Sequence, residues 1–515
     1  MNRFISFAVM SAAVLSHAYV TYDGRTVPDL PLPSDTVNVS TNLQFHMALI
    51  ALTPGQTILL ADGAYDMANY EPLTLNDSNV CIRGASNDPT KVIITGHGFS
   101  NNYNVDEELF VLNTSHVTFA YITISESRCH GVKFQSGNND RTIFHCVRFI
   151  NIGERKIKGP SSTNALACTV RYCHFEDLEL PATDRCVGTP CEGFDEGGNY
   201  IAGMDIRNGD SWVMENNCFV NIRGATGQGR GGIFLWNSTV NMIAQANTFI
   251  NCDKSICFGN PSGVSTSVDG GYIRNNMIYP GIAMGIEMYD CNNIKVFNNT
   301  TFSSLNTSSG ALFYTRSQNC QIKNNIFYGG LNLTGNSPDT AKNITVTRSN
   351  KAVIGRWFQG DVSAGNLHLV SDTSSAINNG VNLSDVTLDW DGLARDSQND
   401  IGADEYSNNP VAVDVSAAIK GETYLSNAHP NPFNPSTVIR YGISKRESFC
   451  PFSITVLSAD GKEVRTLVEG IMIGGNYAVK WDGADNTGNQ VASGRYIIRL
   501  QAGNNIKTVI ATTLR

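Results

Sequence analysis

The stretch AGMDIRNGDSWVMENNCF (residues 202–219) recurs in altered form as GGIFLWNSTVNMIAQANTF (231–249), MGIEMYDCNNIKVFNNTTF (284–302) and GALFYTRSQNCQIKNNIF (310–327). Each copy begins with alternating apolar and polar residues, turns at asparagines and ends in a second short apolar segment. Alternation with a period of two is the pattern of a β-strand that is buried on one face. The repeated unit is therefore predicted to be strand, turn and strand.

The spacing of the copies predicts how they stack. The expected inward residue of the first strand recurs at intervals of 29, 23, 30 and 26 residues. A unit of this size cannot bury its apolar face alone, so successive turns must share one core. The predicted fold is all-β: a right-handed parallel β-helix, followed by a small immunoglobulin-like β-sandwich. The inward series is Ile206, Leu235, Phe258, Met288 and Tyr314.

A second series supports this alignment. Asparagines fall at equivalent turns of the repeats, where stacked side-chain amides can bond to one another and to the backbone. A run of glycosylation sites such as Asn237-Ser238-Thr239 would explain the Asn-x-Thr matches but not their period. Phe219, Phe249 and Phe327 each follow a ladder position by two and are predicted to pack inside the coil. The predicted ladder is Asn217, Asn247, Asn276, Asn299 and Asn325.

Four regions are predicted along the chain. Residues 1–18 resemble a signal peptide, because an apolar run after Arg3 ends in the small-x-small site Ser16-His17-Ala18. Residues 19–406 form the β-helix, with a capping helix over about 43–52. The segment DWDGLARDSQNDIGADEYS (389–407), similar to the closing segment of many bacterial β-helix proteins, ends it. Residues 407–422 form a linker and residues 423–515 the sandwich.

Composition and charge exclude several classes of protein. The charged fraction is only 16%, which disfavours long surface helices. The 37 Lys and Arg against 46 Asp and Glu give a net charge of −9, so nucleic acid is not an expected partner. No stretch beyond the signal peptide is long and apolar enough to span a membrane, and a monomer is expected. Among 13 cysteines, Cys186 and Cys191 are the predicted disulfide, while others such as Cys218 are predicted to be small buried residues.

Residues beside the inward series should point outward and form a continuous outer strip, because turns stack about 4.8 Å apart. This strip combines cations, carboxylates and aromatic rings, which suit an acidic sugar chain. Ordinary solvated surface is the alternative for any single member. One predicted column is Lys133, Lys156, Asp205, Phe234, Cys257, Glu287 and Phe313, and the other is Gln135, Lys158, Arg207, Trp236, Gly259, Tyr289 and Thr315. The candidate substrate-binding residues are Lys133, Lys156, Asp205, Trp236, Glu287, Tyr289 and Arg316.

The tail carries a specific set of motifs. HPNPFNPST (429–437), Trp481-Asp482-Gly483, the segment 494–500 and the terminal Arg515 closely resemble the C-terminal sorting domains of the type IX secretion route. The resemblance implies a bacterial protein that is secreted or held at the cell surface, with the secretion machinery as a partner of the tail. A carbohydrate-binding module of the same fold is the alternative.

The middle turns resemble the polysaccharide lyases of the chondroitinase B and alginate lyase type. The resemblance covers about residues 43–249 and is carried by GERKIK (153–158) and MDIRNG (204–209). It implies Lys158 as the catalytic base and Arg207 as the catalytic arginine. It places Asn151 and Glu154 among the calcium ligands, although the activity is not expected to require calcium.

The residues themselves support this chemistry. β-Elimination at a uronic acid needs a cation that neutralises the carboxylate and a base that removes the C5 proton. Arg207 can supply the cation. Lys158 is expected to lie beside Lys156 and Arg207, and such like charges would favour its free amine. Tyr289 or a water is expected to donate a proton to the leaving oxygen.

Other functions share parts of this pattern. A glycoside hydrolase needs two carboxylates about 5–9.5 Å apart, whereas Asp205 and Glu287 should be three turns, or roughly 14 Å, apart. A uronate C5-epimerase shares the first proton abstraction and stays open. A surface protein that binds or adheres to polysaccharide without cleaving it is the non-enzymatic alternative. The sequence thus predicts a secreted polysaccharide lyase, with these two alternatives.

Overall fold

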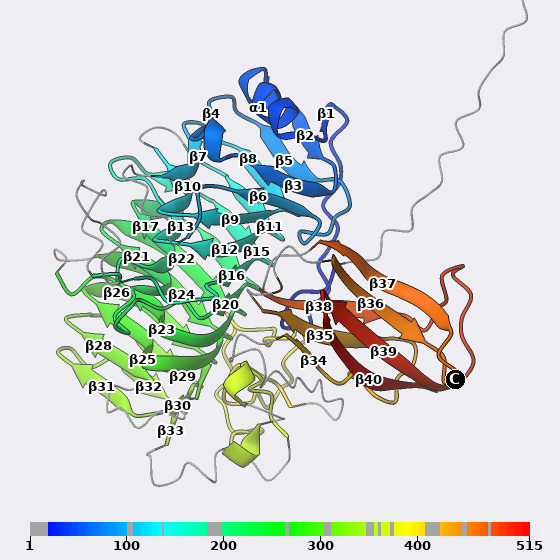
Figure 1. Cartoon of the computed structure of the whole chain (residues 1–515). Coiled ribbons are helices and arrows are strands. Elements are labelled where there is room, and N and C mark those ends of the chain that lie inside the picture. The colour runs from blue at the N-terminus through cyan, green and yellow to red at the C-terminus, as the bar shows by residue number, and fades with distance from the viewer. Residues whose placement is uncertain are drawn as a thin grey trace, which may run out of the picture.

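The computed structural model describes residues 19–99, 107–135, 139–182, 197–262, 267–302, 311–346, 355–358, 362–370, 375–406, 423–444, 447, 451–471 and 475–514. Within these residues the chain forms a parallel β-helix followed by a separate pair of antiparallel sheets (Figure 1). The all-β prediction and its two parts are confirmed. The predicted signal peptide and linker lie outside the described residues.

Three ladders of parallel strands make the faces of the β-helix. The first ladder consists of β1 (Thr36–Val39), β2 (Thr57–Leu60), β5 (Val80–Gly84), β8 (Val117–Ala120), β11 (Ile143–His145), β15 (Thr169–Arg171), β19 (Val213–Glu215), β22 (Thr239–Gln245), β24 (Val268–Arg274), β26 (Cys291–Phe297), β29 (Gln321–Lys323) and β32 (Asp339–Ala341), with β14 (Ala165–Leu166) and β18 (Gly209–Asp210) beside it.

The second and third ladders meet along one corner, which the long strands β23 and β25 cross without a break. The second ladder consists of β3 (Gly63–Asp66), β6 (Val92–Thr95), β9 (Thr123–Ser127), β12 (Arg148–Ile152), β16 (His174–Glu176), β20 (Cys218–Val220), β23 (Thr248–Phe258), β25 (Met277–Tyr289), β27 (Thr300–Thr301), β30 (Ile326–Tyr328) and β33 (Ile344–Val346). The third consists of β4 (Leu73–Leu75), β7 (Glu108–Leu112), β10 (His130–Phe134), β13 (Arg155–Lys158), β17 (Ala202–Arg207) and β21 (Gly231–Trp236), then β23 and β25, β28 (Leu312–Thr315) and β31 (Leu331–Thr334).

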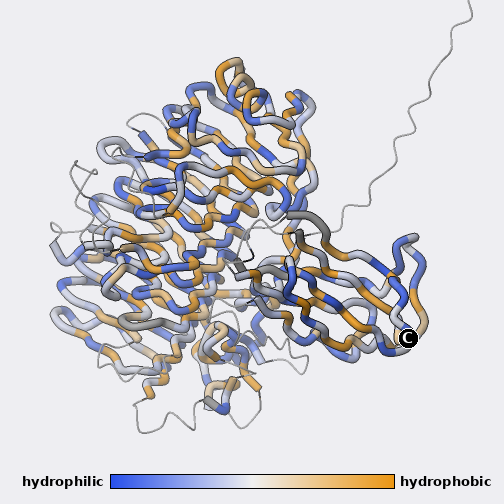
Figure 2. The backbone as a smooth tube through the Cα atoms, in the orientation of Figure 1, coloured by the Kyte–Doolittle hydropathy of each residue, from blue (hydrophilic) through white to orange (hydrophobic). Residues whose placement is uncertain are grey.

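The interior of the coil is one continuous apolar core. Apolar and polar residues alternate along each turn (Figure 2), as a strand with one buried face requires. Phe219 stacks on Phe249 with ring centroids 4.7 Å apart, which confirms that part of the predicted aromatic column. Phe327 is buried in the same core, with Ile278 and Thr301 at the positions between. The ten described cysteines are all buried, while Cys186 and Cys191 lie outside the described residues.

The asparagine ladder is confirmed. Asn247 Nδ2 donates to Asn276 Oδ1 at 3.0 Å, and Asn247 Oδ1 accepts from the backbone and side-chain N–H groups of Asn217, each at 3.0 Å. The same bonds continue toward the C-terminal end of the coil through Asn299, Asn325 and Asn343. Each amide therefore satisfies buried backbone groups at a turn where no strand partner is available.

Asn247→Ala is expected to destabilise the β-helix strongly. It leaves the buried N–H of Asn217 and the carbonyl of Met214 without their partners. Each unsatisfied buried group costs about 1–3 kcal/mol. Urea unfolding followed by circular dichroism measures the loss, with the exposed Asn332→Ala in β31 as the control, expected to change stability by less than about 0.5 kcal/mol. Equal stabilities of the two variants would contradict the structural role of the ladder.

Separate elements close the two ends of the coil. Helix α1 (Asn42–Ile50) covers the N-terminal end, where Phe45 and Leu49 are buried, which confirms the predicted cap (Figure 1). Its N-cap is Thr41, whose hydroxyl accepts from the backbone N–H of Gln44. Short 3-10 turns follow at η1 (Ala68–Tyr70), η3 (Gly355–Trp357) and η4 (Val362–Ala364).

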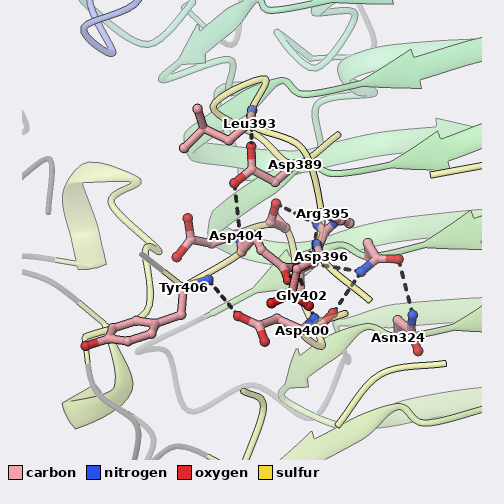
Figure 3. A network of polar contacts seen from close by, with 12 residues as sticks. Asn324, Asp389, Leu393, Arg395, Asp396, Asp400, Gly402, Asp404 and Tyr406 are labelled. Atoms are coloured by element: carbon pink, nitrogen blue, oxygen red, sulfur yellow. Dashed lines mark hydrogen bonds and ion pairs between the residues drawn. The ribbon is translucent and has the colours of Figure 1, made fainter. Parts of the chain in front are cut away.

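The closing segment at residues 389–406 is held by a dense polar network (Figure 3). Arg395 pairs with Glu405 at 2.9 Å and also donates to the carbonyl of Gly402. Asp389 accepts from the backbone N–H of Leu393 at 2.8 Å. The segment packs Trp390 and Ile401 over the last turns of the coil, against Ile326 and Tyr328. These contacts support its predicted role in ending the β-helix.

The tail is built from two antiparallel sheets with its own core. Arg440 donates from Nε to the carbonyl of Tyr22 at 3.0 Å, and Tyr424 packs with Tyr22 against Cys218. The tail thus contacts the second ladder, whereas the outer strip lies on the third. One sheet contains β34 (Tyr424–Leu425), β35 (Thr437–Ile443) and β38 (Gly475–Trp481), and the other β37 (Glu463–Ile471), β36 (Pro451–Leu457), β39 (Gly494–Ala502) and β40 (Asn505–Thr513).

Candidate functional site

The outer face of the third ladder carries the outer strip, with one change of alignment. The observed column runs Lys133, Lys158, Asp205, Phe234, Cys257, Glu287 and Phe313. Lys158 therefore pairs with Asp205, and not with Arg207 as expected. The alignment predicted around Ile157 is wrong by two residues, which changes the neighbours of Lys158 but keeps it on the outer face.

Lys156 does not lie on the outer strip. Its side chain is fully buried, its ammonium forms an ion pair with Asp177 at 2.5 Å and it donates to the carbonyl of Ile152 at 2.9 Å. This contact corrects the expectation that Lys156 binds substrate. It also removes the like charge that was expected to favour the free amine of Lys158.

Asp205 is the centre of the site. Its carboxylate accepts from Lys158 Nζ at 2.7 Å, from Arg155 Nε at 3.0 Å and from Trp236 Nε1 at 2.7 Å. Burial alone would raise the pKa of the Asp205 carboxyl, but the cations of Lys158 and Arg155 hold that pKa well below its usual range. Asp205 is thus a fixed anion on β17 that positions groups from β13 and β21, and we assign it this positioning role in place of direct contact with an acidic substrate.

Tyr200 is a member of the site that the sequence analysis missed. Lys158 Nζ donates to the Tyr200 hydroxyl at 2.8 Å, and the Arg155 guanidinium lies over the Tyr200 ring at 3.7 Å. The residue stands in the connection before β17, outside any strand. Strand alternation gives no information about such a position, so no signal in the repeat could have identified it.

Arg207 has no acidic partner among the described residues, unlike Lys133, Lys158 and Arg316. Its guanidinium lies over the Trp236 ring, 4.7 Å from the centroid, and its Nε is buried without a hydrogen-bond acceptor there. Trp236 is half-buried and stacks on Phe234. As far as the chain is described, the outer strip therefore offers a guanidinium without an acidic partner beside a partly exposed ring.

The remaining predicted residues are spread farther along the coil. Lys133 pairs with Glu108, and Glu287 is buried against Lys254 at 2.8 Å. Arg316 lies over the ring of Tyr289 and pairs with Asp290 at 2.6 Å. Burial and the nearby Glu287 raise the pKa of the Tyr289 hydroxyl. Tyr289 stands four turns from Lys158, roughly 19 Å, so the two cannot act on one sugar linkage.

Asn151 and Glu154 lie at the corner between the second and third ladders. The Asn151 amide donates to Glu126 at 2.7 Å and accepts from the backbone N–H of Leu178 at 2.9 Å. Glu154 Oε2 lies 3.5 Å from His130 Nε2. Their polar atoms thus contact protein groups, and calcium at these two residues stays a prediction.

Comparisons with known proteins give a family match within the tail and solved structures that are similar in part to the coil. Residues 447–505 match the FlgD Ig-like domain family. A sequence comparison with curated proteins gives no match. No helix within the described ranges has the length and hydropathy needed to cross a membrane.

Solved structures with a similar course of the chain include three enzymes. They are the pectate lyase Pel9A (16% identity, TM-score 0.46, covering 75% of this chain and 99% of that one), an alginate lyase from Paenibacillus sp. str. FPU-7 (11%, 0.41, 60% and 99%) and the A-module of the Azotobacter vinelandii mannuronan C-5 epimerase AlgE6 (13%, 0.34, 59% and 95%). Likeness at this level carries no argument about activity, so the function must be inferred from the site itself.

Proposed function

We propose that the outer strip binds an acidic polysaccharide and that the groups around Asp205 cleave it by β-elimination. The observation that carries the proposal is the Arg207 guanidinium, which has no acidic partner in the described part of the chain and lies on the same strand face as Asp205 and its partner Lys158. Unpaired guanidinium groups in partly buried positions are suited to carboxylates, which they hold through two parallel hydrogen bonds.

Arg207 neutralises the carboxylate of one uronate residue, with the sugar ring on Trp236. Neutralisation makes the proton on C5 more acidic, and the fixed guanidinium stabilises the negative charge that develops on the carboxylate as that proton leaves. Because Asp205 holds Trp236 through its indole N–H, the ring and the guanidinium keep one orientation.

Lys158 and Tyr200 form the proton-transfer pair. Lys158 can accept a proton only in its deprotonated form; in that form its two N–H groups donate to Asp205 and Tyr200, and its lone pair points away from both, toward a bound sugar. Lys158 accepts the C5 proton, the C4–O bond breaks as the C4–C5 double bond forms, and Tyr200 donates its proton to the leaving oxygen. The Lys158 ammonium then returns a proton to Tyr200, so both groups are restored without any other reactant.

Arg207→Ala is expected to weaken polymer binding by about 10- to 100-fold, because a hydrogen bond to a charged group contributes roughly 1.5–3 kcal/mol. Calorimetric titration with a uronate oligosaccharide measures the change. The same sugar with its carboxyl groups reduced to alcohols should bind the parent and Arg207→Ala equally weakly. A parent protein that binds both sugars with equal affinity would contradict the proposed contact.

We also propose that the tail directs export, which makes the protein secreted or surface-attached. Support comes from the motif at residues 429–437, whose Phe433 packs on Trp481 in the tail core. Asn431 of the same motif accepts from the backbone N–H of Thr512 at 2.7 Å. The motif thus connects the start of the tail to its last strand. We place the catalytic chemistry in the β-helix alone.

A further inference from the structure

A group of three titratable side chains lies at the N-terminal end of the corner between the second and third ladders, away from the Asp205 site. Glu71 precedes β4, His97 follows β6 and Glu107 precedes β7. One ligand atom from each of the three lies within 4.8 Å of the other two. Two connections from successive turns, the one before β4 and the one between β6 and β7, therefore converge on one point.

The distances in this group fit a shared ion better than direct hydrogen bonds. His97 Nδ1 lies 3.4 Å from Glu71 Oε2 and 3.3 Å from Glu107 Oε1. An N–H···O bond is normally 2.7–3.2 Å long. Nitrogen and oxygen ligands at about 2.0–2.1 Å from a tetrahedral ion are about 3.3 Å apart.

An unsatisfied carboxylate points into the same space. The Glu71 side chain is only 8% exposed, and its Oε1 has no hydrogen-bond donor among the described residues. A Cβ at Gly96 would lie 2.4 Å from Glu71 Oε1 and 2.3 Å from Glu107 Oε1, so these two oxygens approach each other over a residue that has no side chain. Two buried carboxylates this close repel each other unless one of them takes up a proton or a positive charge lies between them.

Two hydrogen bonds from backbone N–H groups hold the Glu107 carboxylate in one orientation. Its Oε1 accepts from the backbone N–H of His97 at 2.6 Å, and its Oε2 accepts from the backbone N–H of Arg128. Such outer contacts fix the direction of a ligand and are usual around protein-bound metals. The carboxylate is fully buried, so it cannot serve as a glycosidase group that must reach a sugar.

We propose that Glu71, His97 and Glu107 bind one divalent transition-metal ion of the zinc type. One imidazole nitrogen and two carboxylate oxygens suit zinc, which accepts nitrogen and oxygen at four positions, with a water as the fourth ligand. Calcium is disfavoured, because it takes six to eight ligands that are all oxygen. The ion links the connection before β4 to the two ends of the connection between β6 and β7, and it stabilises the N-terminal end of the coil.

The test uses the untagged full-length protein after dialysis against a chelator, because a histidine tag would itself bind the probe. Titration with ZnCl2 should give one site per chain, a raised Tm and at least tenfold weaker affinity in His97→Ala and Glu71→Gln. CoCl2 should give a visible absorption band in the parent that both variants lose, a readout that reports the coordinated ion directly. CaCl2 should not compete.

Two control variants locate the site. His368→Ala alters the other converging group of the described residues, which contains Asp391 and Asp404, and His116→Ala alters an exposed imidazole. Both should bind zinc as the parent does. The proposal is overturned if folded His97→Ala or Glu71→Gln binds zinc as tightly as the parent, if His368→Ala abolishes the site, or if the parent binds no zinc. Should His97→Ala fail to fold, the nearly isosteric Glu71→Gln decides.

Discussion

Lys158→Arg is expected to keep the fold and the affinity for an acidic polysaccharide while losing about 10²–10⁴-fold of the β-elimination rate. That range is what loss of a general base typically costs. An arginine can still pair with Asp205, so the buried carboxylate keeps a partner, but its guanidinium does not give up a proton near neutral pH. The variant thus separates the positive charge of Lys158 from its ability to accept a proton.

Two further variants make this test decisive. Tyr200→Phe removes the hydroxyl that accepts from Lys158 and should lower the rate without changing affinity. Lys323→Ala, on the first ladder and paired with Asp339, should leave both quantities unchanged. The rates come from the ultraviolet absorbance of unsaturated product, and the affinities from calorimetry. A Lys158→Arg variant that turns over at the parental rate would show that another group, with Tyr200 the first to examine, accepts the proton.

Asp205→Asn is expected to destabilise the β-helix by about 3–5 kcal/mol, the usual cost of removing one partner from a buried ion pair. Asp205 is 1% exposed and accepts from two cations and an indole, so an amide of the same shape leaves Lys158 and Arg155 without a counter-charge. Asp339→Asn, which alters an exposed partner of Lys323, should change stability by less than about 1 kcal/mol. The free energy of unfolding in urea gives both values.

The pH dependence of this difference follows from the lowered pKa of Asp205. The carboxyl is more acidic in the folded chain than in the unfolded one, so its contribution is complete above the unfolded value of about 3.9. It is lost as the pH falls below that value, through the folded pKa. The stability gap between the parent and Asp205→Asn should therefore be constant from pH 5 to 7 and shrink below pH 4. A gap that closes already between pH 5 and 7 would contradict the stated charge state.

The fold could be predicted from the sequence because the same pattern of strand, asparagine turn and strand recurs in several repeats. Asn217, Asn247 and Asn276 fix the turns, and alternation around Ile206 and Leu235 fixes which face is buried. A slip in one repeat would break both series at once, so the two patterns support each other.

The site could be predicted only in part. Arg207 and Trp236 lie on regular strands that pair residue for residue, so alternation placed them correctly on the outer face. Lys156 and Lys158 lie on a strand that starts at a corner, where the alignment shifted by two and one of the lysines became buried. Tyr200, which the chain brings to Lys158 from an irregular connection, has no counterpart in the repeats.

The most direct test of the proposed function is the appearance of unsaturated product when the purified protein is incubated with a panel of uronate polymers. We expect ultraviolet absorbance to rise with at least one polymer in the presence of the parent protein, and not in the presence of Arg207→Ala or Lys158→Arg. Binding of these polymers without any rise in absorbance would contradict β-elimination. Exchange of the C5 proton with deuterated solvent would then distinguish an epimerase, which exchanges it, from a protein that only binds.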